Sequence, residues 1–133
     1  MKLGYENKTI ITYGTFDTFH FGHWNILRRA SLLGNRLIVG VSSDEFNEIK
    51  NKKSFHSFKK RKEIIETLNF VDLVIKEDSW EQKRQDIIDN NVDIFVMGDD
   101  WVGEFDYLSD ICEVQYLQRT KHISSTQMKK ILD

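Results

Sequence analysis

Hydrophobic and polar positions along the chain follow two alternating periods. Short runs of β-branched and aromatic residues, typical of buried strands, occupy residues 9–13, 36–42, 71–75, 92–98 and 113–117. Between them, apolar residues recur every three or four positions, as in helices, over residues 24–33, 45–49, 58–69 and 79–90. Strands that alternate with helices predict an α/β fold: one Rossmann-like, doubly wound domain over residues 1–133 with a five-stranded, mainly parallel sheet.

Helix start signals support these boundaries. Ser57 is placed to cap the helix over residues 58–69, and Asp44 is expected to cap the short helix over residues 45–49. Serine and glutamine three residues apart form capping-box patterns at 79–82 and 124–127, and the second predicts a C-terminal helix. The polar, basic segment 50–57 is expected to be a mobile loop.

The stretch that carries chemistry joins the first strand to the first helix. A loop that starts at Gly14 leads to a helix that begins near His20, Gly22 and His23. Free backbone N–H groups and the helix dipole favour an anion at such a junction, and two histidines add donors suited to a triphosphate being cleaved. Histidines three apart could also bind a metal or cap the helix, but no third ligand has a metal-site spacing.

Basic residues concentrate in one further segment. Seven of the 19 lysines and arginines fall within residues 50–62 of a chain whose net charge is −2, which favours an anionic ligand there. Lys59, Lys60 and Lys62 are expected to face solvent.

The overall composition excludes several classes of protein. A net charge of −2 with 40% hydrophobic and 30% charged residues gives no reason to expect a general nucleic-acid or membrane binder. No apolar run approaches the ~20 residues of a membrane span. The lone Cys112 cannot form an internal disulfide, which favours a cytoplasmic location.

The motifs carry a resemblance to a known family. Residues 14–17 (Gly-Thr-Phe-Asp) and 20–23 (His-Phe-Gly-His) resemble the signature of cytidylyltransferase-type nucleotidyltransferases, relatives of the class I aminoacyl-tRNA synthetases. With further matches at 97–101 (Met-Gly-Asp-Asp-Trp), 119–120 (Arg-Thr) and 123–126 (Ile-Ser-Ser-Thr), nearly the whole chain is similar to the glycerol-3-phosphate cytidylyltransferases.

The resemblance implies an enzyme that transfers CMP from CTP to glycerol 3-phosphate and gives CDP-glycerol and pyrophosphate. An acceptor phosphate would attack the α-phosphorus in line, so positioning and charge stabilisation dominate catalysis. The expected partners are CTP and a small phosphorylated polyol, with neither nucleic acid nor membrane. Mg²⁺ as cofactor, a homodimer, and a product used as a teichoic acid or capsule precursor are further expectations.

The resemblance also assigns roles to individual residues. Four are expected to be catalytic, namely His20, His23, Lys50 and Arg119. The expected nucleotide-binding residues are Gly14, Thr15, Phe16, Gly22, His23, Gly98, Asp100, Trp101, Arg119, Thr120, Ser124, Ser125 and Thr126. The expected acceptor-binding residues are Asp17, Lys50, Lys52 and Arg61. No metal ligand is assigned.

Side-chain chemistry supports several of these roles and leaves alternatives. A carboxylate at Asp100 can accept a hydrogen bond from the exocyclic amine of cytosine, which uracil lacks, and Arg119 can place a bidentate fork on phosphate. Trp101 could instead pack in the core, and Asp17 could instead stabilise its own turn. Ser124 could be only a helix cap.

Two positions depart from the family pattern. His122 stands where the last signature usually has glycine, and Asn69 stands where glycerol-3-phosphate enzymes commonly have arginine. The acceptor could therefore be another alditol phosphate or an amino-alcohol phosphate, or ATP could replace CTP. A nucleotide-binding module without turnover is the alternative from a different class, although the paired histidines argue against it.

Overall fold

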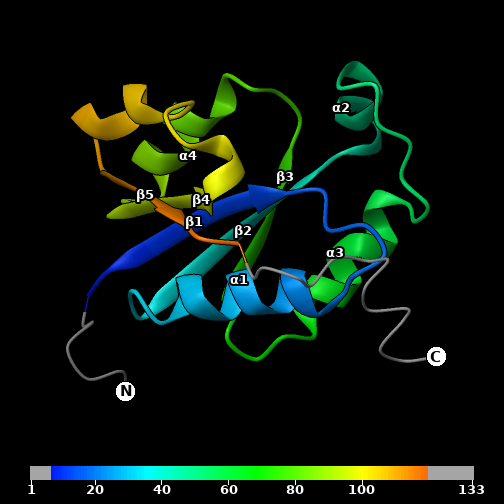
Figure 1. Ribbon diagram of the computed structural model, residues 1–133, viewed down its shortest axis with the longest axis horizontal. Helices are drawn as coiled ribbons and strands as arrows, with labels where there is room; N and C mark the ends of the chain where they lie inside the picture. The colour runs from blue at the N-terminus through cyan, green and yellow to red at the C-terminus, as the bar shows by residue number, and fades with distance from the viewer. Residues whose placement is uncertain (1–6, 120–133) are drawn as a thin grey trace.

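The computed structural model describes residues 7–119, which contain one five-stranded sheet (Figure 1). Neighbouring strands are parallel throughout, in the order β3-β2-β1-β4-β5. The strands are β1 Thr9–Gly14, β2 Arg36–Ser42, β3 Leu73–Glu77, β4 Ile94–Gly98 and β5 Glu113–Leu117. This all-parallel sheet, with a strand order that reverses beside β1, is the predicted Rossmann-like, doubly wound arrangement.

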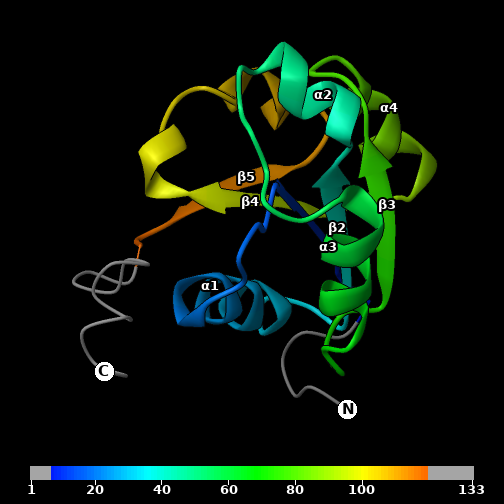
Figure 2. The same cartoon turned by 90° about the vertical axis from the view of Figure 1, so that its right-hand side faces the viewer.

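Helices cover both faces of the sheet (Figures 1 and 2). They are α1 Phe21–Ser31, α2 Asp44–Ile49, α3 Phe58–Glu66 and α4 Gln82–Asp89, with 3-10 turns η1 Asp99–Trp101 and η2 Asp106–Asp110. α1 and α3 lie on one face, and α4 and the 3-10 turns lie on the other. Among the residues described, no helix is both long and apolar enough to cross a membrane.

Adjacent residues of the central strand pack on opposite faces of the sheet. Ile10 joins Leu27 of α1 and Ile65 of α3 in one apolar cluster. Its neighbour Ile11 joins Ile87 of α4 in a second cluster. Burial of each of these side chains stabilises the fold by about 1.5–3 kcal/mol, so both helix layers are fixed to the same strand.

Three helix starts differ from the prediction, and α4 begins at Gln82, three residues late. α1 begins at Phe21, three residues early, because His20 caps it. The predicted cap of α2 at Asp44 is wrong: the Ser43 Oγ accepts the Phe46 N–H at 3.0 Å. The Asp44 carboxylate instead accepts the first N–H of α3 at 3.0 Å.

Other boundaries match the prediction or shift slightly. Ser57 caps α3 as predicted, and Ser79 and Gln82 exchange the capping-box hydrogen bonds, at 3.1 and 3.2 Å. α3 ends three residues early, and β3 and β4 each begin two residues late. β3 is delayed because the Val71 N–H bonds to the Leu68 carbonyl at 3.1 Å in the turn after α3. The predicted C-terminal helix lies outside the described residues.

Candidate active site

A cavity of about 480 Å³ lies where the neighbouring strands β1 and β4 end. Doubly wound sheets bind ligands at this switch point, because the chain leaves the two strands toward opposite faces. Most of the predicted site residues line this cavity, namely Gly14, Thr15, Phe16, Asp17, His20, Gly22, His23, Lys52, Gly98, Asp100, Trp101 and Arg119. Lys50 and Arg61 do not line it. Thr120, Ser124, Ser125 and Thr126 lie outside the described residues, as does His122.

The two predicted catalytic histidines form a reciprocal cap at the start of α1. The Nδ1 of His20, the N-cap residue, accepts the Gly22 N–H at 3.0 Å. The Nδ1 of His23 in turn accepts the His20 N–H at 3.3 Å, and the two rings stack with centroids 3.9 Å apart. The histidines therefore do cap the helix, through one nitrogen each.

This cap fixes where the protons of both rings lie. A neutral imidazole that accepts at Nδ1 carries its proton on Nε2, so each ring keeps one N–H donor for a ligand. Burial, together with the charge of Arg119, lowers the pKa of His20. Burial, followed by the charges of His20 and Arg119, lowers the pKa of His23 to about 4. At neutral pH both rings are therefore uncharged donors.

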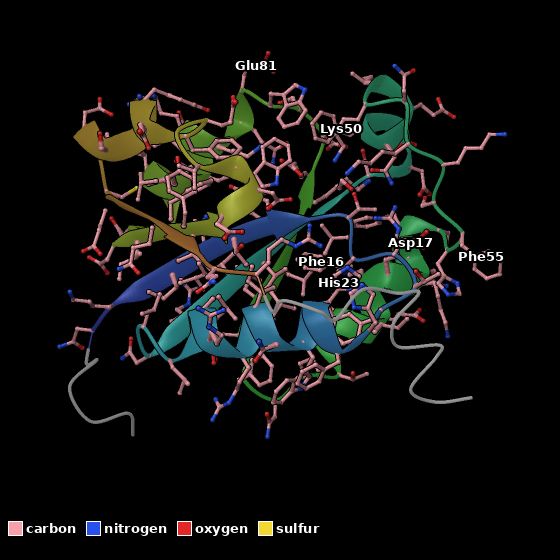
Figure 3. The ribbon with its side chains drawn as sticks, in the orientation of Figure 1. Phe16, Asp17, His23, Lys50, Phe55 and Glu81 are labelled. Carbon is pink, nitrogen blue, oxygen red and sulfur yellow. The ribbon has the colours of Figure 1, made fainter. Side chains whose placement is uncertain are left out.

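Phe16 closes one side of the histidine pair. Its backbone has a φ of +53°, a left-handed conformation that is rare for a bulky residue. The turn directs the buried Phe16 ring edge-on to the His23 ring, with centroids 5.6 Å apart (Figure 3). A Cβ at Gly14 would lie 2.8 Å from the Phe16 ring, so glycine is required for this packing.

The residues after β4 and β5 build another wall of the cavity. A Cβ at Gly98 would lie 2.8 Å from the Asp100 carboxylate, so glycine lets that carboxylate rest against the strand end. Arg119 donates its backbone N–H to Asp99 at 3.3 Å, and its guanidinium lies 3.6 Å from Asp100. The side chains of Asp100 and Arg119 are 51% and 63% exposed, so a ligand can reach both.

Trp101 packs against apolar residues and also lines the cavity. Its ring packs against Trp80 and Phe105, with centroid distances of 6.1 and 5.5 Å. Trp101 thus packs against the second apolar cluster, as the alternative role expected, while its position in the cavity wall leaves contact with a base as a prediction.

Asp17 ties the histidine loop to the basic loop. Its carboxylate accepts the Phe55 and His56 N–H groups at 2.5 and 2.9 Å. Partial burial raises the pKa of this carboxyl, but the backbone N–H groups of His56, Phe55 and Thr18 outweigh it and lower the pKa. The alternative of a structural role is thus supported, although most of these bonds go to a distant loop, and contact with an acceptor stays a prediction.

Arg61 does not line the cavity, and its buried position does not fit the predicted contact with an acceptor. Its side chain is 0% exposed. The guanidinium donates to the carbonyls of Thr15, Ser42 and His56 at 3.0, 2.8 and 3.1 Å, and to the Asp44 carboxylate at 2.8 Å. Its donors are thus committed to the loops that surround the cavity, which it joins to one another.

The two predicted phosphate-binding lysines differ in the cavities that they line. Lys52 lines the main cavity with Lys53, which belongs to the basic cluster but was not predicted as a site residue. Lys50 lines only a smaller cavity beside it, which Lys52 also lines, and the Lys50 Nζ lies 4.5 Å from the centroid of the Phe46 ring (Figure 3). Burial lowers the pKa of Lys50 to about 8, although the charge of Glu77 acts to raise it.

The pattern also missed a buried ion pair next to the site. Lys83 and Glu77 are 1% and 3% exposed and lie 2.5 Å apart, and both line the smaller cavity. Lys83 shares the buried face of α4 with Ile87, four residues on. The four-residue spacing from the apolar Ile87 was the sequence signal that Lys83 is buried, but a lysine on a helix is usually expected to face solvent.

The residues expected outside the site do lie outside it. Lys59 and Lys60 are exposed, and the Lys62 side chain is 40% exposed.

Asn69 lies in a surface groove beside Trp24, and this groove shares no lining residue with the main cavity. Because Asn69 does not line the cavity that residues 7–119 form, having asparagine rather than arginine at this position removes no charge from that cavity.

A metal site built by the protein alone is not found in the described part of the chain. Within residues 7–119, no three histidine, cysteine or acidic side chains come close enough to hold a metal ion. The metal alternative for the histidine pair therefore lacks a third ligand in this range.

Known proteins were compared with the sequence and with the fold. The cytidylyltransferase-like family matches residues 11–131. The chain is 58% identical over 123 residues to the glycerol-3-phosphate cytidylyltransferase of Bacillus subtilis (strain 168), across 92% of this chain and 95% of the relative. It is 54% identical over 125 residues to the protein of the same name from Staphylococcus aureus (strain NCTC 8325 / PS 47), across 94% and 95%.

A solved structure shares the fold at low sequence identity. The crystal structure of the lipopolysaccharide core biosynthesis protein from Thermoplasma volcanium GSS1 matches with a TM-score of 0.76 and 23% identity, over 86% of this chain and 98% of that one. The family match spans all of the cavity-lining motifs. The chain is therefore a member of the cytidylyltransferase-like family.

Proposed function

We propose that this protein is a nucleotidyltransferase that transfers CMP from CTP to glycerol 3-phosphate and releases pyrophosphate. One observation carries the proposal: two uncharged histidines at a helix start line the same cavity as Lys52 and Arg119. Helix N-termini and paired donors of this kind stabilise phosphoryl charge. The choice of substrates is supported by relatives, 54% and 58% identical, that are named glycerol-3-phosphate cytidylyltransferases.

The reaction needs no covalent intermediate with the protein. An oxygen of glycerol 3-phosphate attacks the α-phosphorus of CTP and forms a new P–O bond. The bond from the α-phosphorus to the oxygen that bridges to the β-phosphate breaks, and the electron pair leaves with pyrophosphate. His20 and His23 donate from Nε2 to the oxygens on which charge grows, and Lys52 and Arg119 attract the leaving pyrophosphate.

The cytosine is recognised by the residues after β4. Asp100 accepts a hydrogen bond from the exocyclic amine, and its half-exposed carboxylate is free to do so beside Arg119. Trp101 supplies a flat surface for the ring. Gly98 leaves room for the Asp100 carboxylate, which would lie 2.8 Å from a Cβ at this position.

The site would hold Mg²⁺ together with the triphosphate. Mg²⁺ keeps several waters and binds through one or two carboxylates plus substrate phosphates, so it needs no cluster of three protein ligands. Asp17 would hold it, because this ionised carboxylate lines the cavity and each oxygen that accepts one N–H keeps a second lone pair. When bound, Mg²⁺ neutralises charge on the phosphates.

We also propose a cytoplasmic homodimer. Phe21 and Trp24 of α1 are 45% and 37% exposed, and Trp24 packs on Phe70 with ring centroids 5.9 Å apart. Exposed aromatic patches of this kind commonly mark protein interfaces. The free thiol of Cys112 fits a reducing compartment. Sedimentation at several protein concentrations tests the assembly, and a monomer at every concentration would contradict it.

Pyrophosphate release tests the reaction itself. The protein is assayed with Mg²⁺ and CTP or ATP across a panel of acceptors headed by glycerol 3-phosphate. We expect turnover with CTP and glycerol 3-phosphate. Turnover only with another alditol or amino-alcohol phosphate, or only with ATP, would keep the chemistry and reassign a substrate. Nucleotide binding without pyrophosphate release would indicate a binding module.

A further inference from the structure

Asn47 of α2 places a buried side-chain amide beside the nucleotide cavity. The residue is 1% exposed and lies on the short helix between β2 and the basic loop. A buried amide needs hydrogen-bond partners for its oxygen and for its NH₂ group, because leaving either unpaired is costly. Here those partners lie on the ends of β1 and β2 and on the basic loop, so the amide joins three segments around the cavity.

The amide oxygen reaches the ends of two neighbouring strands. Ser42, the last residue of β2, donates its hydroxyl to the Asn47 Oδ1 at 2.7 Å. Thr15, which follows β1 and lines the cavity, has its Oγ1 3.4 Å from the same oxygen and 3.2 Å from the Ser42 Oγ. A carbonyl oxygen has two lone pairs and can accept from both hydroxyls. Asn47 therefore holds the Thr15 hydroxyl in one orientation at the cavity wall.

The NH₂ group and the main chain of Asn47 reach the basic loop. The Asn47 Nδ2 donates to the Ser54 Oγ at 3.3 Å. The Asn47 carbonyl accepts the Lys52 N–H at 2.8 Å, directly after the left-handed Asn51. Lys53 lies in the chain between these two bonds. The residues that carry both lysines of the main cavity are therefore held to Asn47 on either side.

These hydrogen bonds matter because little else fixes the two lysines. Lys52 and Lys53 are exposed, so apolar packing does not hold them, and neighbouring ammonium groups repel each other. Asp17 holds the same loop further on, through the N–H groups of Phe55 and His56. Asn47 acts on the part of the loop that carries the charge.

We propose that Asn47 is a positioning residue for the triphosphate. Its side-chain amide holds the Thr15 hydroxyl and residues 52–54 in one arrangement before the nucleotide binds, so less ordering is left for the phosphates to impose. The base lies at another wall, built by the residues after β4, and does not depend on the amide. This inference rests on the proposed function, because it assigns Lys52 to the phosphates of CTP.

The affinities for CTP and CMP separate the phosphate wall from the base wall. CMP has the base and the α-phosphate but lacks the two phosphates that Lys52 attracts. Both dissociation constants are measured by calorimetry on the whole protein with Mg²⁺, and the constant for CMP is divided by that for CTP. Asn47→Leu keeps the size of the side chain and the main-chain bond to Lys52 but removes both polar ends of the amide. We expect the ratio to fall at least about fivefold, with CMP affinity within about threefold of wild type.

Two further variants test the bond to the loop and the effect of destabilisation. Ser54→Ala removes only the partner of the Asn47 Nδ2 and should lower the ratio about threefold. In the double variant with Asn47→Leu, it should lower the ratio no further, because the bond is already lost. Val92→Ala is the control: it creates a cavity in the second apolar cluster and should destabilise the fold without changing the ratio.

The outcomes separate this inference from the proposed function. A folded Asn47→Leu whose ratio falls by less than about twofold overturns the inference. Losses from Ser54→Ala and Asn47→Leu that multiply in the double variant also overturn it, since Ser54 would then act without Asn47. If Asn47→Leu does not fold, the ratio in Ser54→Ala decides by the same limit. A wild type that binds CTP but releases no pyrophosphate with any acceptor overturns the proposed function, and the affinity ratios still decide the role of Asn47.

Discussion

The backbone N–H of His20 bonds to the Nδ1 of His23 at 3.3 Å, while their rings stack 3.9 Å apart. Helix capping therefore uses the Nδ1 of each ring and leaves Nε2 for the phosphate chemistry proposed above. The cap holds both rings in one orientation and one tautomer before any ligand arrives, and such preorganisation is what a charge-stabilising site requires.

His20→Asn separates the two roles. Asparagine is a favoured N-cap residue, so α1 keeps its cap while the Nε2 donor is lost. We expect kcat to fall by at least about 100-fold, with the CTP dissociation constant within about tenfold of wild type. Single-turnover kinetics and equilibrium binding measure the two quantities. His20→Ala is the matched comparison, since it also loses the cap, which costs about 1 kcal/mol. Turnover close to wild type in His20→Asn would refute the catalytic role.

The low pKa of His23 makes stability depend on pH. The ordinary histidine pKa of 6.5 applies to the unfolded chain, whereas the pKa in the folded protein is about 4. As pH falls from 6.5 to 4, the unfolded chain takes up a proton that the folded one does not. As pH falls through this range, His23 therefore lowers the free energy of unfolding by about 3 kcal/mol in total. Urea unfolding at about pH 7 and about pH 4.5 should show a smaller acid loss in His23→Asn than in the wild type. Equal losses would contradict the assignment.

Lys50 is expected to set the alkaline limit of activity. Its pKa of about 8 means that its charge is lost as pH rises through that value. The kcat/KM for CTP reports groups of the free enzyme and should decline above about pH 8. Lys50→Arg keeps its charge and should extend activity to higher pH. The exposed Lys60 provides the control, because Lys60→Arg should leave the profile unchanged. An alkaline limit that stays in place in Lys50→Arg would point to another group.

Arg61→Lys tests whether this residue acts through the loops or on the acceptor. Lysine keeps the charge but cannot reach the carbonyls of Thr15, Ser42 and His56 together, and leaving such groups unpaired destabilises by about 1–3 kcal/mol each. We expect a lower melting temperature and a similar fall in kcat/KM for both substrates. Unchanged stability with a rise in the acceptor KM alone would restore direct contact with the acceptor.

The topology was predictable because its signals are local. Runs of β-branched residues and three-to-four-residue periods survive in the structure with boundary shifts of two or three residues. Some shifts arise where a side chain competes for a backbone group, as when Ser43 rather than Asp44 caps α2, and others where a backbone turn extends a helix end, as before β3. Within the described residues, the motifs after β1 and β4 and Arg119 after β5 also came together as predicted, because the carboxyl ends of parallel strands meet at one edge of the sheet.

The absence of Lys50 from the main cavity could not be predicted from the sequence. Lys50 and Lys52 are close in the chain, but Lys50 is the C-cap residue of α2 and Asn51 has a φ of +58°. This left-handed residue turns the chain, so Lys52 lines both cavities and Lys50 lines only the smaller one. The burial of Arg61 could not be predicted either. The sequence shows that Arg61 lies four residues before Ile65, but it does not show the carbonyls that accept hydrogen bonds from the guanidinium.

The carboxylate of Asp17 joins the loop that carries the histidines to the loop that carries Lys52 and Lys53. The two loops therefore lose their conformational freedom together. If a phosphate fixes the lysines as proposed, the same event would restrain the start of α1, so the entropy of ordering the site would be lost once for both loops. Asp17 would then link nucleotide affinity to the rigidity of the histidine pair, together with Arg61, which bonds the carbonyls of Thr15 and His56 in the same two loops.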